Sequence, residues 1–138
     1  MRIQITPRAK TDSGAGTLTI APSALRVRHR PLRVLDFDIE NRPLSYLGSD
    51  FTTAEITAIA WAWCGRPRED VSVSCVLLGE VEPVTMLQAF VSAYNHADMV
   101  TGHYITGHDL PLINGALMEY GLPTLADKCV QDTKTQLV

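Results

Sequence analysis

Hydrophobic and polar residues alternate in three segments after residue 31, and each segment predicts a β-strand. The segments are residues 32–40 (LRVLDFDIE), 55–64 (EITAIAWAWC) and 71–78 (VSVSCVLL). All three contain many β-branched or aromatic residues, and a turn-like GRPR sequence separates the last two. Three strands joined by short connections predict an antiparallel meander at one side of a sheet.

After these strands the hydrophobic period lengthens to about 3.6 residues, which predicts helices. The first helix is expected to begin near Pro83 and to turn the following residues inward: Val84, Leu87, Val91 and Tyr94, with Phe90 beside them. The second is expected to run from Asp109 to Gly121, with these inward positions: Leu110, Ile113, Leu117 and Tyr120. Short strands at 99–101 and from Cys129 complete a βββαβαβ order, which is typical of an α/β fold with a mixed sheet.

Residues 1–30 differ from the rest of the chain in pattern and in charge. They include a small, polar stretch without a period (TDSGAGT), so we expect a weakly ordered arm ahead of one domain at 31–138. Residues 1–33 hold seven basic residues and one acid, whereas the remaining residues hold five basic residues and fourteen acids. Such a basic arm is either a solvated tail or a contact for nucleic acid. Three of its cations would share one side of an extended chain and suit a phosphate backbone: Arg26, Arg28 and Arg30.

Length and composition narrow the class of protein. The chain has 138 residues, of which 46% are hydrophobic and 20% charged, as expected for one globular domain. No apolar stretch reaches the roughly eighteen residues of a membrane span, and the N-terminus lacks the apolar core of a signal peptide. Cys64, Cys75 and Cys129 form no C-x-x-C pair, so neither a disulfide framework nor a zinc ribbon is expected. These features predict a reduced, cytoplasmic protein without a membrane partner.

Acidic residues lie at two positions where they could carry chemistry. Asp38 and Glu40 are two residues apart on a predicted strand and therefore share a face. Two close carboxylates repel each other, and a hard divalent cation is the usual reason to keep them together. Asp109 is expected at a helix N-terminus, either as an N-cap or as a third carboxylate that is brought toward the first two.

The segment VLDFDIEN, followed about seventy residues later by VTGHYITGHDLPLINGALMEYGLP, resembles the motifs of the DnaQ-like (DEDD) 3′–5′ exonucleases. The similarity is strongest to predicted exonucleases that bacteriophages encode, and it covers about residues 32–136. It implies a ribonuclease H-like mixed sheet, with Asp38, Glu40 and Asp109 as catalytic and metal-binding carboxylates. It also implies two Mg²⁺ or Mn²⁺ ions about 4 Å apart, one activating water and the other stabilising the leaving 3′-oxygen. An all-oxygen ligand set agrees with hard cations.

The same resemblance assigns weaker roles to other residues and shows departures. His103 matches a histidine that orients the site, and Asn41 stands where a Thr or Ser often touches the terminal nucleotide. Tyr104 replaces the usual Asn of the second motif, and His108 replaces an aromatic residue. Asp132 belongs to an Asp-Thr pair that is common on the following strand, and we expect it to be structural.

The sequence therefore predicts a metal-dependent 3′–5′ exonuclease that acts on nucleic acid, with single-stranded DNA 3′ ends as substrate, in the host cytoplasm if a phage encodes it. The family's third motif lies on a helix beyond the fifth strand, so we expect a C-terminally incomplete fold with no fourth acid and no general base in this chain. Three alternatives stay open. They are a degenerate or truncated domain that binds nucleic acid or a replication partner without catalysis, a fragment of a longer chain, and an endonuclease or ribonuclease H of the same superfamily. Trp61 and Trp63 are expected to pack in the core or at an interface, with base stacking as the alternative.

Overall fold

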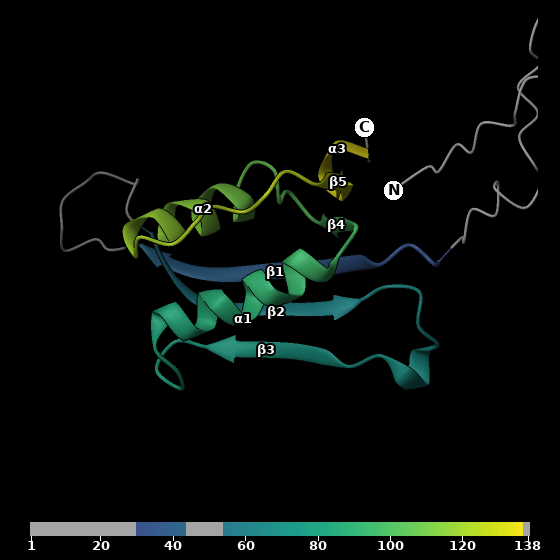
Figure 1. The fold of residues 1–138 in the computed structure, drawn as a ribbon, viewed down its shortest axis with the longest axis horizontal. Coiled ribbons are helices and arrows are strands. Elements are labelled where there is room, and N and C mark those ends of the chain that lie inside the picture. The colour runs from purple at the N-terminus through teal and green to yellow at the C-terminus, as the bar shows by residue number, and fades with distance from the viewer. Residues whose placement is uncertain (1–29, 44–53, 137–138) are drawn as a thin grey trace, which may run out of the picture. The chain divides into compact units, whose positions relative to one another are not determined.

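The computed structural model describes residues 30–43 and 54–136 (Figure 1). The five strands are β1 (Val34–Pro43), β2 (Ala54–Trp63), β3 (Val73–Leu77), β4 (Met99–Gly102) and β5 (Cys129–Asp132). The helices are α1 (Pro83–His96), α2 (Asp109–Glu119) and the short α3 (Thr133–Gln136), and a 3-10 turn spans Arg68–Asp70. The predicted βββαβαβ order is confirmed, and α3 and the 3-10 turn are additions to it. The proposed arm lies outside the described residues except for Arg30, and Arg26 and Arg28 lie outside them with it.

The strands form one mixed sheet in the order β3-β2-β1-β4-β5. β1 pairs antiparallel with β2, and β2 pairs antiparallel with β3, as the meander predicted. β4 and β5 run parallel to β1 because α1 and α2 provide the crossovers that parallel neighbours require. This arrangement is the α/β, ribonuclease H-like mixed sheet that the sequence predicted.

The two faces of β1 differ completely in burial. Leu35, Phe37 and Ile39 are at most 5% exposed and form one core with buried residues of both α1 and α2. The alternate residues Asp36, Asp38 and Glu40 point to the opposite side and are exposed. We call this side the exposed face of β1. The period of two in the sequence thus places hydrophobic residues under the helices and carboxylates away from them.

An irregularity in the pairing with β2 keeps two isoleucines on the core side. Ile59 lies opposite Ile39, and Ile56 lies opposite Asn41, although the two β2 residues are three positions apart. The pairing register shifts between Glu40 and Asn41, so β2 has one extra residue there. Such a bulge restores the inward direction of a side chain that simple alternation would turn outward.

The inward face of α1 is rotated relative to the sequence prediction. In α1 the buried residues are Met86, Leu87, Phe90 and Tyr94, whereas Val84 and Val91 are only partly buried. Phe90 lies at the centre of this contact because its ring packs against three aromatic rings of the core: Phe37, Trp61 and Tyr94.

In α2 the prediction holds for two of its four inward positions. Ile113 and Leu117 are completely buried. Leu110 is only partly buried, and Tyr120 is 44% exposed because the helix ends at Glu119. The expected inward position of Tyr120 is therefore wrong.

The tryptophans of β2 belong to the core, as predicted. Trp61 lies opposite Phe37 on β1, and its ring centroid is 6.0 Å from that of Phe90. Trp63 also packs against the buried cluster. Both tryptophans are partly buried and pack against the core.

Two further expectations concern the cysteines and membrane segments. All three cysteines are exposed free thiols. No helix in the described part of the chain is long and apolar enough to cross a membrane.

Candidate active site

The central strand presents a row of carboxylates. Asp38 and Glu40 lie on the exposed face of β1, and small β2 residues stand opposite them, Ala60 and Ala58. Their shared face, which the spacing predicted, is confirmed. Because alanine side chains are short, both carboxylates stay accessible from this side.

This row has a third member that was not predicted from the sequence. Asp36 points to the same face, two residues before Asp38. Partial burial raises the pKa of Asp36, and the nearby charge of Asp38 raises it further. The D-x-D-x-E pattern is the signal in the sequence that could have revealed this residue.

Asp109 is the first residue of α2, and its carboxylate bonds to the sheet. Its Oδ1 accepts a hydrogen bond of 3.0 Å from the backbone N–H of Ile39. β4 pairs with β1 only from Val34 to Asp36, so the edge of β1 at Ile39 lies beyond the last β4 pair. A buried backbone N–H needs an acceptor, and Asp109 supplies it. The side chain thus connects α2 to β1 between Asp38 and Glu40.

The N-cap alternative for Asp109 is wrong. His108 holds the N-cap position of α2, and its side chain makes no capping hydrogen bond. Asp109 lies one residue further along, inside the helix, and is 1% exposed. Its position is therefore explained by the contact with β1 rather than by helix capping.

The electrostatics of Asp109 show that Asp38 is close. Burial raises the pKa of Asp109 above its ordinary value, and the charge of Asp38 adds to the rise. The hydrogen bond from Ile39 and the nearby His108 act in the opposite direction but do not cancel it. The ionised form of the buried Asp109 side chain is thus disfavoured by its surroundings, and a nearby cation would stabilise it.

Of the residues with weaker predicted roles, Asn41 and His103 both contact protein groups. Nε2 of His108 lies 3.0 Å from Oδ1 of Asn41, so the end of β1 is joined to the start of α2. Nδ1 of His103 lies 3.1 Å from the Thr133 hydroxyl, on the side of β5. Arg30 is exposed.

The residue that replaces the usual Asn of the second motif has an unusual backbone. Tyr104 has φ of 60° and is the only non-glycine residue with positive φ among those described. This left-handed conformation costs about 1 kcal/mol or more for most residues, and Asn tolerates it better than Tyr. Nζ of Lys134 lies 3.3 Å from the centroid of the Tyr104 ring, and any side chain at Gly107 would collide with that ring. The ring therefore lies between the Lys134 ammonium and the backbone of Gly107, while the residue stays 43% exposed.

Asp132 has the structural role that the sequence analysis expected. The residue is 4% exposed and receives hydrogen bonds from the backbone N–H groups of Tyr104, Thr106 and Lys134 and from the Thr106 hydroxyl. These donors lower the pKa of Asp132 to about 2. Its carboxylate joins the end of β5 to the loop that precedes α2.

The structure does not gather the predicted ligands into a complete metal site. Within residues 30–43 and 54–136, no three His, Cys, Asp or Glu side chains lie close enough together to hold a metal ion. Asp109 reaches the edge of β1, whereas Asp38 and Glu40 stand on its exposed face. The donor chemistry fits Mg²⁺ or Mn²⁺, because all three residues offer carboxylate oxygens.

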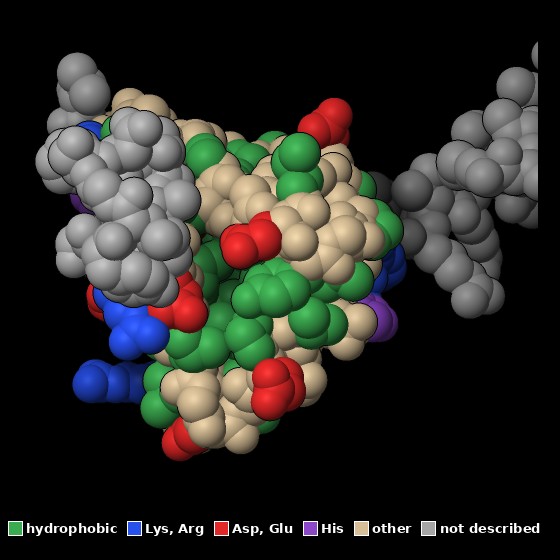
Figure 2. Space-filling view, turned by 90° about the vertical axis from the view of Figure 1, so that its left-hand side faces the viewer, with side chains coloured by type: hydrophobic (Ala, Val, Ile, Leu, Met, Phe, Trp, Pro, Cys, Tyr) green, Lys and Arg blue, Asp and Glu red, His purple; other side chains and the backbone are tan. Residues whose placement is uncertain are grey.

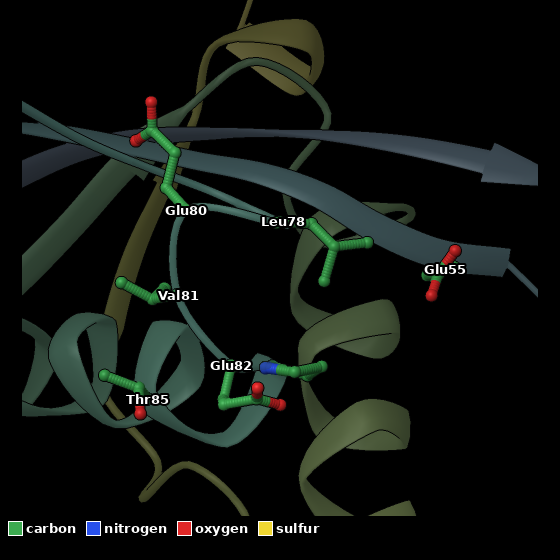
Figure 3. Close-up of a pocket in the computed structure, with 8 residues that line it drawn as sticks. Glu55, Leu78, Glu80, Val81, Glu82 and Thr85 are labelled. Carbon is green, nitrogen blue, oxygen red and sulfur yellow. The ribbon is translucent and has the colours of Figure 1, made fainter.

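A surface hollow of about 630 Å³ lies away from these carboxylates. It lies between β2, the end of β3 and the start of α1 and contains three acids, Glu55, Glu80 and Glu82. Figure 2 shows acidic side chains around an apolar surface on this side of the molecule. Their carboxylates point in different directions (Figure 3), and Glu55 is already paired with Arg42 at 2.6 Å. This hollow shows no convergent set of ligands.

Among solved structures, a family B DNA polymerase from the hyperthermophilic archaeon Pyrobaculum calidifontis has a similar fold. The TM-score is 0.60 with 18% sequence identity, over 78% of this chain and 16% of the polymerase chain. The chain thus spans about a sixth of the polymerase's length. No family model matches the sequence, and no curated protein matches it significantly. At this identity the likeness establishes a shared fold.

Proposed function

We propose that this chain is a metal-dependent 3′–5′ exonuclease domain that hydrolyses the terminal phosphodiester of a DNA strand. Asp38, Glu40 and Asp109 would hold the metal ions. The observation that carries the proposal is the 3.0 Å hydrogen bond from Ile39 N–H to Asp109 Oδ1. It joins two motifs 70 residues apart, at the strand residue between Asp38 and Glu40.

The electrostatics support a cation at this place. Three acids of β1 share one face, and burial together with repulsion by Asp38 raises the pKa of Asp109. A bound divalent cation would supply Lewis-acid stabilisation of the phosphate and a more acidic water molecule. The chain's own contribution is the orientation of its carboxylates, with Asp109 held by the main chain of β1.

The substrate contacts follow from the same arrangement. Asn41 would hydrogen-bond the terminal nucleotide, with its direction set by His108. Arg26, Arg28 and Arg30 would bind the phosphate backbone of a single strand. The likeness to a DNA polymerase favours DNA as the nucleic acid, and the phage-like sequence motifs favour action in a host cytoplasm. No general base and no fourth acid are assigned.

Degradation of single-stranded DNA tests this proposal. With Mn²⁺ or Mg²⁺ we expect a 3′-terminal label to be released first, while a 5′ label stays on progressively shorter strands. Asp38→Ala should lower the rate at least 100-fold because it removes a ligand of the proposed ions. Asp70→Ala removes an exposed acid of the 3-10 turn and should change the rate less than twofold. A wild-type protein without metal-dependent label release, or an active Asp38→Ala variant, would refute the assignment.

One observation favours a second candidate function, which is binding of nucleic acid without cleavage. The carboxylates of the described residues are not gathered as a metal site requires. Calorimetric titration with Mn²⁺ separates the two candidates. Tight binding of two ions supports the exonuclease, whereas no binding, together with DNA affinity that survives EDTA, supports the binding domain.

A further inference from the structure

The loop between β4 and α2 determines where Asp109 lies. The carbonyl oxygen of Tyr104 accepts a hydrogen bond of 3.0 Å from His108 N–H, and that of Ile105 accepts one of 2.9 Å from Leu110 N–H. These bonds form the turn from which α2 starts. The backbone at residues 104 and 105 therefore sets the position of the first helical residue, Asp109.

Asp132 holds this loop from the end of the neighbouring strand β5. Its Oδ1 accepts hydrogen bonds from the N–H groups of Tyr104 at 2.8 Å and Lys134 at 3.0 Å. Its Oδ2 accepts hydrogen bonds from the N–H of Thr106 at 3.0 Å and from the hydroxyl of the same residue. A carboxylate offers about four acceptor sites, so these donors saturate both oxygens. Asp132 has no acceptor site left for a metal ion.

We propose that Asp132 is a positioning residue for Asp109. By holding the loop, it keeps the Asp109 carboxylate against the N–H of Ile39. The connection runs from β5 through the loop to α2 and then to β1. Its functional meaning rests on the proposed metal-binding role of Asp109.

The backbone of Tyr104 explains why the loop needs a strong anchor. Its φ of 60° is unfavourable for a Tyr, so the loop would relax if its N–H lost the Asp132 acceptor. Lys134 reinforces the same conformation because its Nζ lies over the Tyr104 ring while its N–H bonds to Asp132. Asp132 therefore supports a conformation that local preference alone would not select.

The central test replaces Asp132 by Asn, with Asp127→Asn as the matched control. Asn keeps the shape but presents an NH₂ group to at least one of the donors, whereas Asp127 is an exposed acid before β5. Amide hydrogen exchange at Ile39, followed by NMR, should accelerate at least tenfold in Asp132→Asn and stay unchanged in the control. Exchange at Val100, in the buried β4, should not change. We expect Mn²⁺ affinity to fall about tenfold in the same variant, as for other residues that orient metal ligands.

Two further variants keep the test decisive. Thr106→Val removes one of the donors to Asp132 and should give a smaller acceleration at Ile39. Adding Tyr104→Asn to Asp132→Asn should restore at least half of the lost protection, because Asn adopts positive φ more easily. If Asp132→Asn does not fold, unchanged Ile39 exchange in Thr106→Val overturns the proposal. Ile39 exchange in Asp132→Asn equal to that in Asp127→Asn also overturns it.

The measurements separate this proposal from the proposed exonuclease activity. An inactive wild-type protein whose Ile39 exchange still accelerates in Asp132→Asn supports the positioning role and refutes the nuclease. An active wild-type protein whose Asp132→Asn variant retains both activity and Ile39 protection refutes the positioning role alone.

Discussion

Asp109 and Asp132 are the buried carboxylates of the described residues, and their pKa values shift in opposite directions. Asp109 is 1% exposed and Asp132 is 4% exposed, so burial of the two residues is similar. The pKa of Asp109 is raised, whereas the pKa of Asp132 is lowered to about 2. Burial is the largest cause of the rise at Asp109, whereas hydrogen bonds from Thr106 are the largest cause of the fall at Asp132.

Asp132 receives hydrogen bonds at both oxygens from three residues, and these donors stabilise its charge. Asp109, in α2, receives one hydrogen bond from β1, that of the Ile39 N–H, and is repelled by Asp38. A saturated carboxylate serves the structure, whereas a carboxylate with excess negative charge attracts a cation. Burial alone would not have separated these two roles.

Replacing Gly102 by Ala should have the largest effect, because it disturbs the support of both aspartates. Gly102 pairs with Asp132 across β4 and β5. An added Cβ would lie 2.7 Å from the carbonyl oxygen of Phe37 and 2.5 Å from the side chain of Ile105. We expect the free energy of unfolding in urea to fall by about 3 kcal/mol.

The matched control for this prediction is Gly115→Ala in α2. An added Cβ there meets nothing within 4 Å. Because alanine favours helix more than glycine does, the same measurement should show a gain of about 0.5–1 kcal/mol. Equal stability of the two variants would show that the loop tolerates movement away from β1.

Neutralising each aspartate should change stability in opposite directions. Asp132→Asn breaks a buried hydrogen-bond network and should lower Tm by roughly 5 °C or more at pH 7. Asp109→Asn keeps an acceptor for Ile39 N–H and removes an unfavourable charge, so Tm should rise by about 2 °C in EDTA. With Mn²⁺ that advantage should disappear, since the ion would stabilise only the protein with the intact carboxylate. Changes of the same sign in EDTA would refute the comparison.

The loss of stability at low pH should depend on Asp132. Its pKa of about 2 in the folded protein lies below the ordinary value of an Asp near 3.9. The ionised form therefore contributes stability above about pH 4, and this contribution is lost as the pH falls from about 4 to 2. The Tm difference between wild type and Asp132→Asn should be constant from pH 5 to 7 and shrink toward pH 2. A gap that stays constant down to pH 2 would contradict the hydrogen-bonding explanation.

The smallest effect is expected for the substitution Tyr104→Asn. Tyr104→Asn relieves the strain of positive φ, about 1 kcal/mol, but loses the contact of Lys134 with the ring, about 0.5–1 kcal/mol. The free energy of unfolding should therefore change by no more than about 0.5 kcal/mol. Tyr104→Val should lose about 2 kcal/mol, because a β-branched residue fits this conformation poorly. Equal effects of Asn and Val would show that φ at this position does not matter.

The secondary structure was largely predictable because its signals are local. Alternation in residues 32–40 and 55–64 marked β1 and β2, and the change to a period of 3.6 marked α1 and α2. The inward faces were less predictable, since the rings around Phe90 select which side of α1 is buried. Tyr120 was misplaced because the period does not show where α2 ends.

The candidate site also has features that local sequence patterns predict and features that they do not. The shared face of Asp38 and Glu40 follows from strand geometry alone, and Asp36 could have been found by the same rule. The contact of Asp109 with Ile39 was not deducible from local patterns, because it depends on β4 ending before β1 does. The saturated network of Asp132 also joins segments that are 26 to 28 residues apart, besides its local bond to Lys134.

By itself, the sequence determined the order of elements, the mixed sheet and the row of carboxylates on β1, because backbone periodicity and short connections specify these features. Only the tertiary structure decided which buried aspartate has a raised pKa and which a lowered one. The physical reason is that the charge of a carboxylate is stabilised or destabilised by donors and charges that the fold brings from other segments. Asp109 and Asp132 have the same chemistry in the sequence, and their surroundings in the fold distinguish them.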